Sequence, residues 1–296
     1  MRDRSPRLRY VLVGAVACAL LVAGCSSGKP VKFDTQAFAT AIFQPDQFIL
    51  AGIGLTVSIS VISQFIGIVL GVFGALGRLS RRRPARWLSA AYLWVFRVTP
   101  LLVQLVFFYF GLGAVHLYDW NAIDVAGITI PGAIQAGIFA LGLNEGAYMT
   151  EIIRAGILSI DPGQMEAAKS VGMTYGQAMR RIVLPQAARI IVPPLGNEFN
   201  NMLKTTALLF VLGVQELYNT FVIKQGNNFL PFEMYLACAL WFLLLTTIWG
   251  FFQGWMERRL ARVTAGSEAS SGPGLGRRLF GFRNQEPDVA VVSGGR

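Results

Sequence analysis

Five long apolar stretches, separated by shorter polar segments, dominate the chain. They cover residues 49–76, 87–112, 130–153, 186–214 and 232–256, and the fourth is the most polar of them. A helix needs about 20 mostly apolar residues to cross the hydrocarbon core of a bilayer. The pattern therefore predicts an all-α integral membrane protein with five core transmembrane helices.

The charged residues between these stretches predict the orientation of the helices. The first connection is basic and carries no acid; its cations are Arg78, Arg81, Arg82, Arg83 and Arg86. Residues 154–189 and 257–262 are also basic, whereas residues 113–128 and 216–232 carry almost no Lys or Arg. Because cytoplasmic loops retain an excess of Lys and Arg, we expect five spans that begin outside and end in the cytoplasm.

The two ends of the chain differ from this pattern. Residues 1–27 are arginine-rich and then apolar over a run too short for a full span, which is typical of a signal-like or anchor segment. The sequence around Cys25 is similar to a bacterial lipoprotein cleavage box, which predicts cleavage before a lipidated Cys25. The alternatives are an uncleaved membrane anchor and a gene start that is assigned too early. Residues 28–48 have the composition of an external linker, and residues 261–296 that of a disordered cytoplasmic tail.

Composition supports the membrane class and argues against several kinds of binding and catalytic site. Hydrophobic residues make up 54% of the chain and charged residues 14%, against roughly 25% charged in a soluble domain. The net charge of +10 is explained by the basic loops, so no nucleic-acid partner is expected. The cysteines are widely separated and there is a single histidine, so the sequence predicts no metal site and no disulfide framework. It also contains no phosphate-binding loop or nucleophile motif. We therefore expect no cofactor and no enzymatic activity.

The most specific pattern lies in the expected cytoplasmic loop, over about residues 159–185. Asp161, Pro162 and Gly163 can begin a short helix, and Gly172 permits a sharp turn before a second one. Pro185 is compatible with the start of the next helix. A loop of this kind, without catalytic groups, is better suited to docking a partner than to chemistry.

This loop resembles the EAA loop of the membrane subunits of ABC importers, whose pattern is E-A-A-x3-G-x9-I-x-L-P. The residues that match are Glu166, Ala167, Ala168, Gly172, Ile182, Leu184 and Pro185. Four further segments, at residues 52–57, 97–104, 146–154 and 204–208, are similar to motifs of the polar amino acid permeases of histidine and glutamine type. Val98 and Ala207 depart from those motifs. The resemblance covers roughly residues 48–260, so we expect the permease domain at residues 49–260.

The resemblance implies a multi-pass permease subunit in the bacterial plasma membrane. It implies two ABC ATPase subunits docked on the EAA loops, a second permease subunit of the same or a different chain, an external substrate-binding protein, and surrounding membrane lipid. ATP hydrolysis would belong to the ATPase subunits. An importer for another small solute is one alternative. An ion-coupled secondary transporter is another, although such a protein has no need of the docking loop.

Polar residues inside two of the expected spans are candidates for the translocation path. An acid at the bilayer centre costs on the order of 3 kcal/mol, so such groups are not expected to face lipid. On the third stretch the candidates are Asn144, Glu145 and Tyr148. On the fourth, Asn197, Asn201 and Lys204 share one helical stripe, with Glu198 and Thr205 on an adjacent stripe. A purely structural role is the alternative. In that case these groups only satisfy one another between helices, for example Lys204 with Glu145 or Glu198, or they bond the partner subunit.

A stripe of small residues on the first stretch also predicts contact between helices. Gly67, Gly71 and Gly74 recur at helical spacing, which allows another helix to approach closely within lipid.

Overall fold

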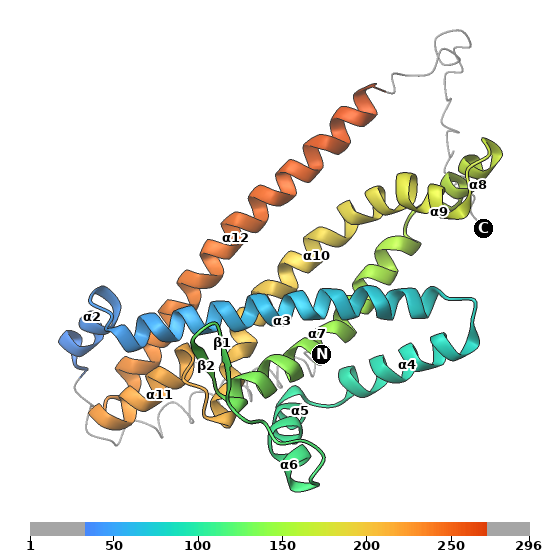
Figure 1. The fold of residues 1–296 in the computed structure, drawn as a ribbon. Helices are drawn as coiled ribbons and strands as arrows, with labels where there is room; N and C mark the ends of the chain where they lie inside the picture. The colour runs from blue at the N-terminus through green and yellow to red at the C-terminus, as the bar shows by residue number, and fades with distance from the viewer. Residues whose placement is uncertain (1–32, 271–296) are drawn as a thin grey trace, which may run out of the picture.

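The computed structural model describes residues 33–270, and the side chains of residues 33–259. Long helices run side by side along the molecule, with α3 (Gln47–Leu79), α7 (Gly132–Leu158), α10 (Leu184–Thr205) and α12 (Pro231–Ser270) as its main elements (Figure 1). Short helices lie at both ends of this bundle. The described part of the chain is therefore helical apart from one small hairpin, as the hydrophobic pattern predicts.

The number of membrane-spanning helices is only partly settled by length and composition. Among the described residues, two helices are long and apolar enough to cross a membrane, namely Gln47–Leu79 and Pro231–Arg259. Two further pairs of bent helices are long and apolar enough only when each pair is counted as one span. The third expected span, at 130–153, forms the continuous helix α7. That helix is not among the candidates, and its Gln135, Asn144 and Glu145 lower its hydropathy. Two to four candidate spans are thus supported, against the expected five.

The second expected span, 87–112, is wrong as a single helix. Its first part is α4 (Arg83–Val98), and its second part comprises α5 (Leu101–Val106), η2 (Phe107–Gly111) and α6 (Leu112–Ala114), bent by 105° relative to α4. Pro100 lies at the bend. Proline has no backbone N–H and disfavours a helical conformation at the preceding residue, Thr99, so the helix ends there.

The glycine stripe of α3 lies against α7, and this is the most extensive helix contact in the fold. A Cβ atom at Gly67 would lie 2.5 Å from Cγ of Glu145, and Cβ atoms at Gly71 and Gly74 would collide with Met149 and Thr150. Glycine at these positions therefore permits the close approach of the two backbones, which confirms the predicted contact.

The expected external end contains more structure than the sequence pattern indicates. The expected linker 28–48 includes α2 (Thr35–Phe43), and the expected loop 216–232 includes α11 (Leu217–Asn228). Glu233, which is 1% exposed, accepts a hydrogen bond from the backbone N–H of Asp34 at 2.7 Å, and Trp241 Nε1 donates to the carbonyl of Ala41. The buried Glu233 and the half-buried Trp241 of α12 thus hold α2 in place.

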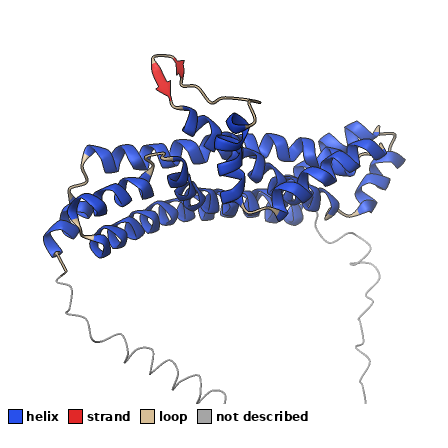
Figure 2. Ribbon diagram, turned by 90° about the horizontal axis from the view of Figure 1, so that it is seen from below, coloured by secondary structure: helices blue, strands red, loops and turns tan. Residues whose placement is uncertain are grey.

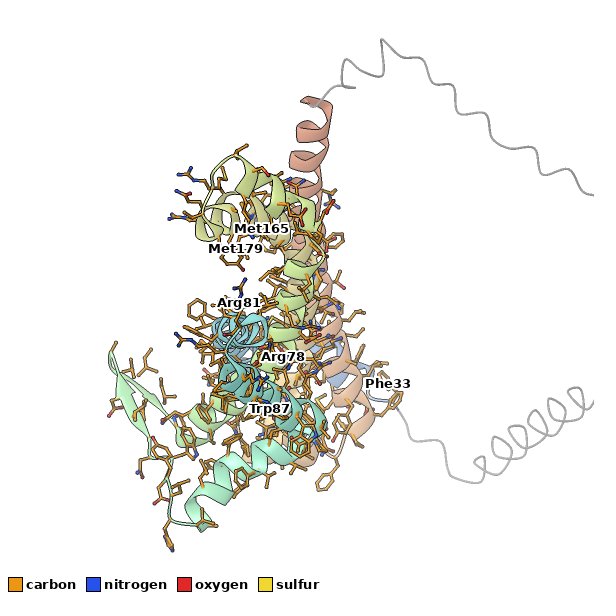
Figure 3. All side chains as sticks on the ribbon, turned by 90° about the vertical axis from the view of Figure 1, so that its right-hand side faces the viewer. Phe33, Arg78, Arg81, Trp87, Met165 and Met179 are labelled. Carbon is orange, nitrogen blue, oxygen red and sulfur yellow. The ribbon has the colours of Figure 1, made fainter. Side chains whose placement is uncertain are left out.

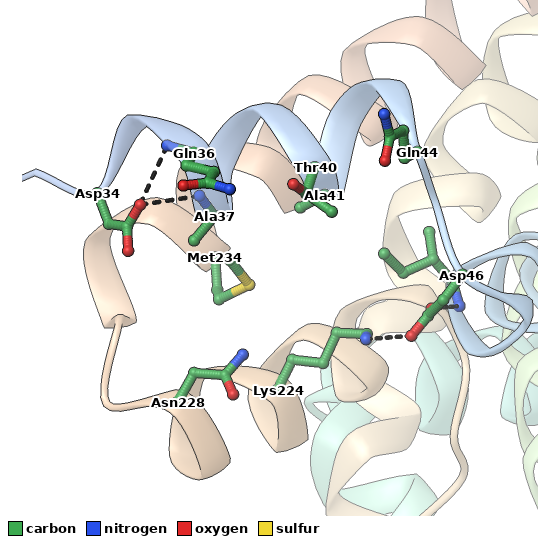
Figure 4. Close-up of a pocket in the computed structure, with 11 residues that line it drawn as sticks. Asp34, Gln36, Ala37, Thr40, Ala41, Gln44, Asp46, Lys224, Asn228 and Met234 are labelled. Carbon is green, nitrogen blue, oxygen red and sulfur yellow. Dashed lines mark hydrogen bonds and ion pairs between the residues drawn. The ribbon is translucent and has the colours of Figure 1, made fainter.

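An ion pair joins α3 to α11 beside α2. Asp46 caps the start of α3 and pairs with Lys224, at the edge of a cavity of about 370 Å³ (Figure 4). Burial raises the pKa of Asp46. Hydrogen bonds from Lys224 and from the backbone N–H of Ile49 outweigh that effect, so the pKa lies below its ordinary value.

The remaining elements complete the two ends. A hairpin of β1 (Ile123–Val125) and β2 (Ile128–Ile130) pairs Ile123 with Ile130 and stands off the helical body (Figure 2). Helix α12 continues to Ser270, so residues 261–270 of the expected disordered tail are helical. The signal-like segment with Cys25, and the rest of the tail, lie outside the described residues.

Candidate functional site

A cavity of about 510 Å³ lies between α4, α5, α7 and α10. It collects most of the polar residues proposed for the translocation path. From α7 it takes Asn144, Glu145 and Tyr148, and from α10 it takes Glu198, Asn201 and Thr205. The other lining residues are Arg97, Val98, Thr99, Pro100, Leu101, Leu141 and Met202. The arrangement therefore brings six of the eight predicted path residues into one space.

Glu145 is the most deeply buried acid of this cavity. Only 6% of its surface is exposed, and its Oε1 atom has no hydrogen-bond partner among the described residues. Gly67 of α3 packs against this side chain so closely that a Cβ atom at Gly67 would lie 2.5 Å from Cγ of Glu145. A buried carboxylate oxygen without a partner is costly, so this acid is poised to bind a hydrogen-bond donor or a cation.

A second acid and a cation lie on other walls of the same cavity. Glu198 on α10 is partly buried. Arg97, in the last turn of α4, lies with its guanidinium carbon 5.4 Å from the centre of the Tyr148 ring, within range of a cation–π interaction. Groups of both signs, together with amides and hydroxyls, are therefore available to one small molecule.

Two amide side chains stabilise the bend that forms one wall of the cavity. Gln104 Nε2 donates to the carbonyls of Phe96 and Thr99 at 3.0 and 3.1 Å and lies 2.7 Å from Thr99 Oγ1. Asn144 Nδ2 donates to the Phe96 carbonyl at 2.9 Å and to Gln104 Oε1 at 3.0 Å. These bonds satisfy carbonyls that the end of α4 leaves free. Arg97, Thr99 and Gln104 were not selected from the sequence, although the segment 97–104 that contains them was.

Asn197 and Lys204 lie outside this cavity. At about 100° between successive helical residues, both lie on the edge of the predicted stripe that is farther from Glu198 and Thr205. Asn201, the third member of that stripe, lies closer to Glu198 and Thr205 and lines the cavity. Lys204 instead lines a separate, mostly apolar space of about 300 Å³ with Tyr218, Tyr235 and Cys238. Within the described part of the chain, no ion pair joins Lys204 to Glu145 or Glu198. The structure therefore does not support this form of the structural alternative.

Segment 52–57 of α3 contacts a buried acid, Glu216, that was not predicted from the sequence. Glu216 is fully buried, and its carboxylate accepts hydrogen bonds from the backbone N–H groups of Tyr218 and Asn219 at the start of α11. Thr56 Oγ1 accepts from the backbone N–H of Leu217 at 3.1 Å, and Gly52 lies against that residue without room for a side chain. The segment therefore joins α3 to α11.

The EAA loop forms two short helices with a turn between them, as predicted. Helix α8 (Pro162–Ser170) is capped by Asp161, and α9 (Tyr175–Ala178) by Thr174, before η3 (Met179–Val183) leads into α10. Gly172 has φ +84°, and the backbone bonds from Gly172 to Lys169 and from Met173 to Ala168 form the turn that ends α8. This conformation favours glycine.

The residues of this loop differ in how open they are to a partner. Glu166, Ala167, Gly172 and Pro185 are exposed, and Leu184 is 43% exposed. Ile182 is half-buried, and Ala168 is 2% exposed because it packs inside the loop. Figure 3 shows this loop, marked by Met165 and Met179, standing beyond the first basic turn. The exposed residues of the loop can therefore contact a partner protein, whereas the buried Ala168 cannot.

Comparison with known proteins adds independent information. Residues 67–262 match the model of a family described as binding-protein-dependent transport system inner membrane component. The chain is 39% identical over 212 residues to an arginine transport system permease protein of Corynebacterium glutamicum, covering 70% of this chain and 66% of that one. It is 39% identical over 207 residues to a probable glutamine ABC transporter permease protein of Bacillus subtilis, covering 70% of this chain and 90% of the relative.

A solved structure gives the same result for the fold. The crystal structure of an amino acid ABC transporter with histidines contains a chain that superposes with a TM-score of 0.67 at 37% identity. The match covers 77% of this chain and all of the other.

Proposed function

The chain belongs to the family of binding-protein-dependent transport system inner membrane components, and from this premise we propose that its central cavity is part of the import path for a polar amino acid. Family membership makes the chain a non-enzymatic permease subunit of an ABC importer in the inner membrane. It also implies an ATPase and a binding protein as partners. The relatives named for arginine and glutamine support polar amino acids as the substrate class.

The observation that carries this proposal is the combination of charges around the 510 Å³ cavity. An amino acid has an ammonium and a carboxylate close together. Glu145 and Glu198 can accept from the ammonium, and Arg97 can donate to the carboxylate. The Asn201 amide can bind either group, whereas Asn144, whose amide N–H groups are already used, can only accept through Oδ1. The substrate would supply the donor that Glu145 Oε1 lacks.

The excess of acid over base favours a substrate with an additional positive charge. Two carboxylates and one guanidinium line the cavity, so a neutral amino acid leaves one carboxylate unpaired, whereas arginine pairs with both. We therefore expect arginine to compete better than glutamine for uptake.

The EAA loop completes the mechanism that we propose. The exposed face of α8, with Glu166 and Ala167, docks on an ATPase subunit, and Gly172 sets the angle between α8 and α9. Leu184 and Pro185 lie where the loop enters α10. Since α10 also lines the cavity, movement of the loop is transmitted directly to the substrate site.

Uptake by the complete transporter, with its ATPase subunit and binding protein, tests the proposed path. Glu145→Gln and Glu198→Gln should each reduce arginine uptake by about tenfold or more, since a charge-assisted hydrogen bond contributes roughly 1.5–3 kcal/mol. Asn197→Ala is the matched control, because Asn197 lies on α10 outside the cavity. Normal uptake in both glutamine variants would reject the path, whereas uptake of a different solute class would reject only the substrate assignment.

A further inference from the structure

The largest of the cavities described here lies at the cytoplasmic end of the fold, between the basic turn and the EAA loop. Its volume is about 660 Å³. Leu76 and Leu79 line it from the last turns of α3, Ile157 from the last turn of α7, and Leu184 from the start of α10. The ends of α3 and α7 and the start of α10 meet here, at the end of the bundle that the basic loops predict to be cytoplasmic.

The walls of this cavity are apolar and open. Leu76 is 57% exposed and Leu184 is 43% exposed, and Tyr175, on the EAA loop side, is 62% exposed. Such side chains are unfavourable in water, so the surface is suited to an apolar ligand or to lipid chains.

Two cations, Arg81 and Lys169, line the same cavity, and none of its lining residues is acidic. Figure 3 places Arg81 next to Met179 of the loop. Arg82, Arg83 and Arg86 extend the positive charge along the turn, and no ion pair involves any of these arginines in the part of the chain that the structure describes. The site therefore combines apolar walls with positive charge.

We propose that this cavity binds an anionic phospholipid of the cytoplasmic leaflet. Its phosphate lies between Arg81 and Lys169, and its acyl chains lie along Leu76 and Leu184. Basic pockets between membrane helices on the cytoplasmic side have the chemistry that recognises such headgroups. An ATPase segment is the less favoured occupant, because Glu166 and Ala167, the exposed docking face of α8, do not line the cavity. The bound lipid would connect the loop directly to α3.

Lipid retention by the purified permease complex tests this proposal. The complex is prepared in vesicles of phosphatidylcholine with and without phosphatidylglycerol, extracted, and examined by native mass spectrometry. Arg81→Gln with Lys169→Gln should weaken phosphatidylglycerol retention by about 30-fold, or about fivefold per cation, as expected for basic residues at a membrane surface. Arg83→Gln with Arg86→Gln removes the same charge outside the cavity and should have little effect. Arg81→Lys with Lys169→Arg keeps the charge and should retain the lipid.

Three results would overturn the proposal. Equal retention in the wild type and the Arg81/Lys169 glutamine variant would show that the cavity binds no anionic lipid. Equal losses in both glutamine pairs would show a diffuse surface effect. Loss of the ATPase subunit from that variant in pure phosphatidylcholine, with phosphatidylglycerol retention unchanged, would assign the cavity to a protein partner. None of these results bears on the substrate path, because no transport is measured.

Discussion

Replacing Gly67 by alanine tests the link between helix packing and the substrate site. The added methyl group would lie 2.5 Å from Cγ and 2.8 Å from Cβ of Glu145. Carbon atoms pack comfortably at about 3.5–4.0 Å, so α3 and α7 must separate by roughly 1 Å, or the Glu145 side chain must be displaced. Either change alters the cavity wall that contains the buried acid.

The expected cost follows from this overlap. Overpacking a well-packed contact costs about 1–3 kcal/mol, which corresponds to a decrease in unfolding temperature on the order of 2–12 °C for a chain of this size. Uptake should fall as well, because Glu145 no longer holds its position. Binding of the ATPase subunit should be unchanged, since Gly67 packs on Glu145 and does not line the cavity beside the EAA loop.

Gly54→Ala provides the control on the same helix. A Cβ atom at Gly54 would meet nothing within 4 Å, and alanine favours a helix more than glycine does. Thermal unfolding and arginine uptake of the two variants should therefore differ clearly. If Gly67→Ala matches Gly54→Ala in both measurements, the close packing of α3 on α7 at this position is wrong.

Three further perturbations have defined outcomes. Gly172→Val should impair uptake and uncouple it from ATP hydrolysis while leaving membrane insertion normal, because the positive φ at this position disfavours a β-branched residue; Gly176→Ala should behave as the wild type, and normal uptake by Gly172→Val would contradict the coupling role. Gln104→Leu should lower the unfolding temperature by several degrees, since the loss of a buried hydrogen-bonding group costs about 1–3 kcal/mol; an unchanged temperature would refute its role at the bend. Because the pKa of Asp46 is lowered, its carboxylate stabilises the fold at pH values above the ordinary carboxyl pKa, and this contribution is lost as the pH falls through the lowered pKa. Asp46→Asn should remove this part of the acid sensitivity of thermal unfolding. An unchanged pH profile of the unfolding temperature would show that Asp46 makes no such contribution.

The parts of the fold that could be predicted from the sequence are those determined by residues close together in the chain. Apolar length predicted α3 and α12. The glycine stripe predicted a close helix contact because small residues at helical spacing leave a groove whatever the partner is. The EAA loop was predictable because its caps and its positive-φ glycine act within a few residues.

The parts that the sequence did not predict depend on distant partners. Helices α2 and α11 are short, with 9 and 12 residues, so their sequence pattern gives a weak signal. Their positions depend on hydrogen bonds to the buried acids Glu233 and Glu216. Pro100 signals a break, but the 105° bend is stabilised by Gln104 and Asn144, which belong to different helices. Helical spacing placed Asn197, Asn201 and Lys204 on one stripe, but only Asn201 of these three lines the cavity. The spacing could not indicate how α10 is rotated relative to α7, so it could not separate Lys204 from the cavity residues.

The hydrogen bonds at this bend also restrict how the permease can move. The Phe96 carbonyl is shared by Gln104 and Asn144 at 3.0 and 2.9 Å, so the end of α4, the start of α5 and the middle of α7 are tied at a single point. Separating them would expose unpaired carbonyls to an environment poor in water, at a cost of several kcal/mol. An alternating-access motion is therefore expected to carry these three segments as one rigid lever, with its flexible joints at the ends of the helices and away from the substrate.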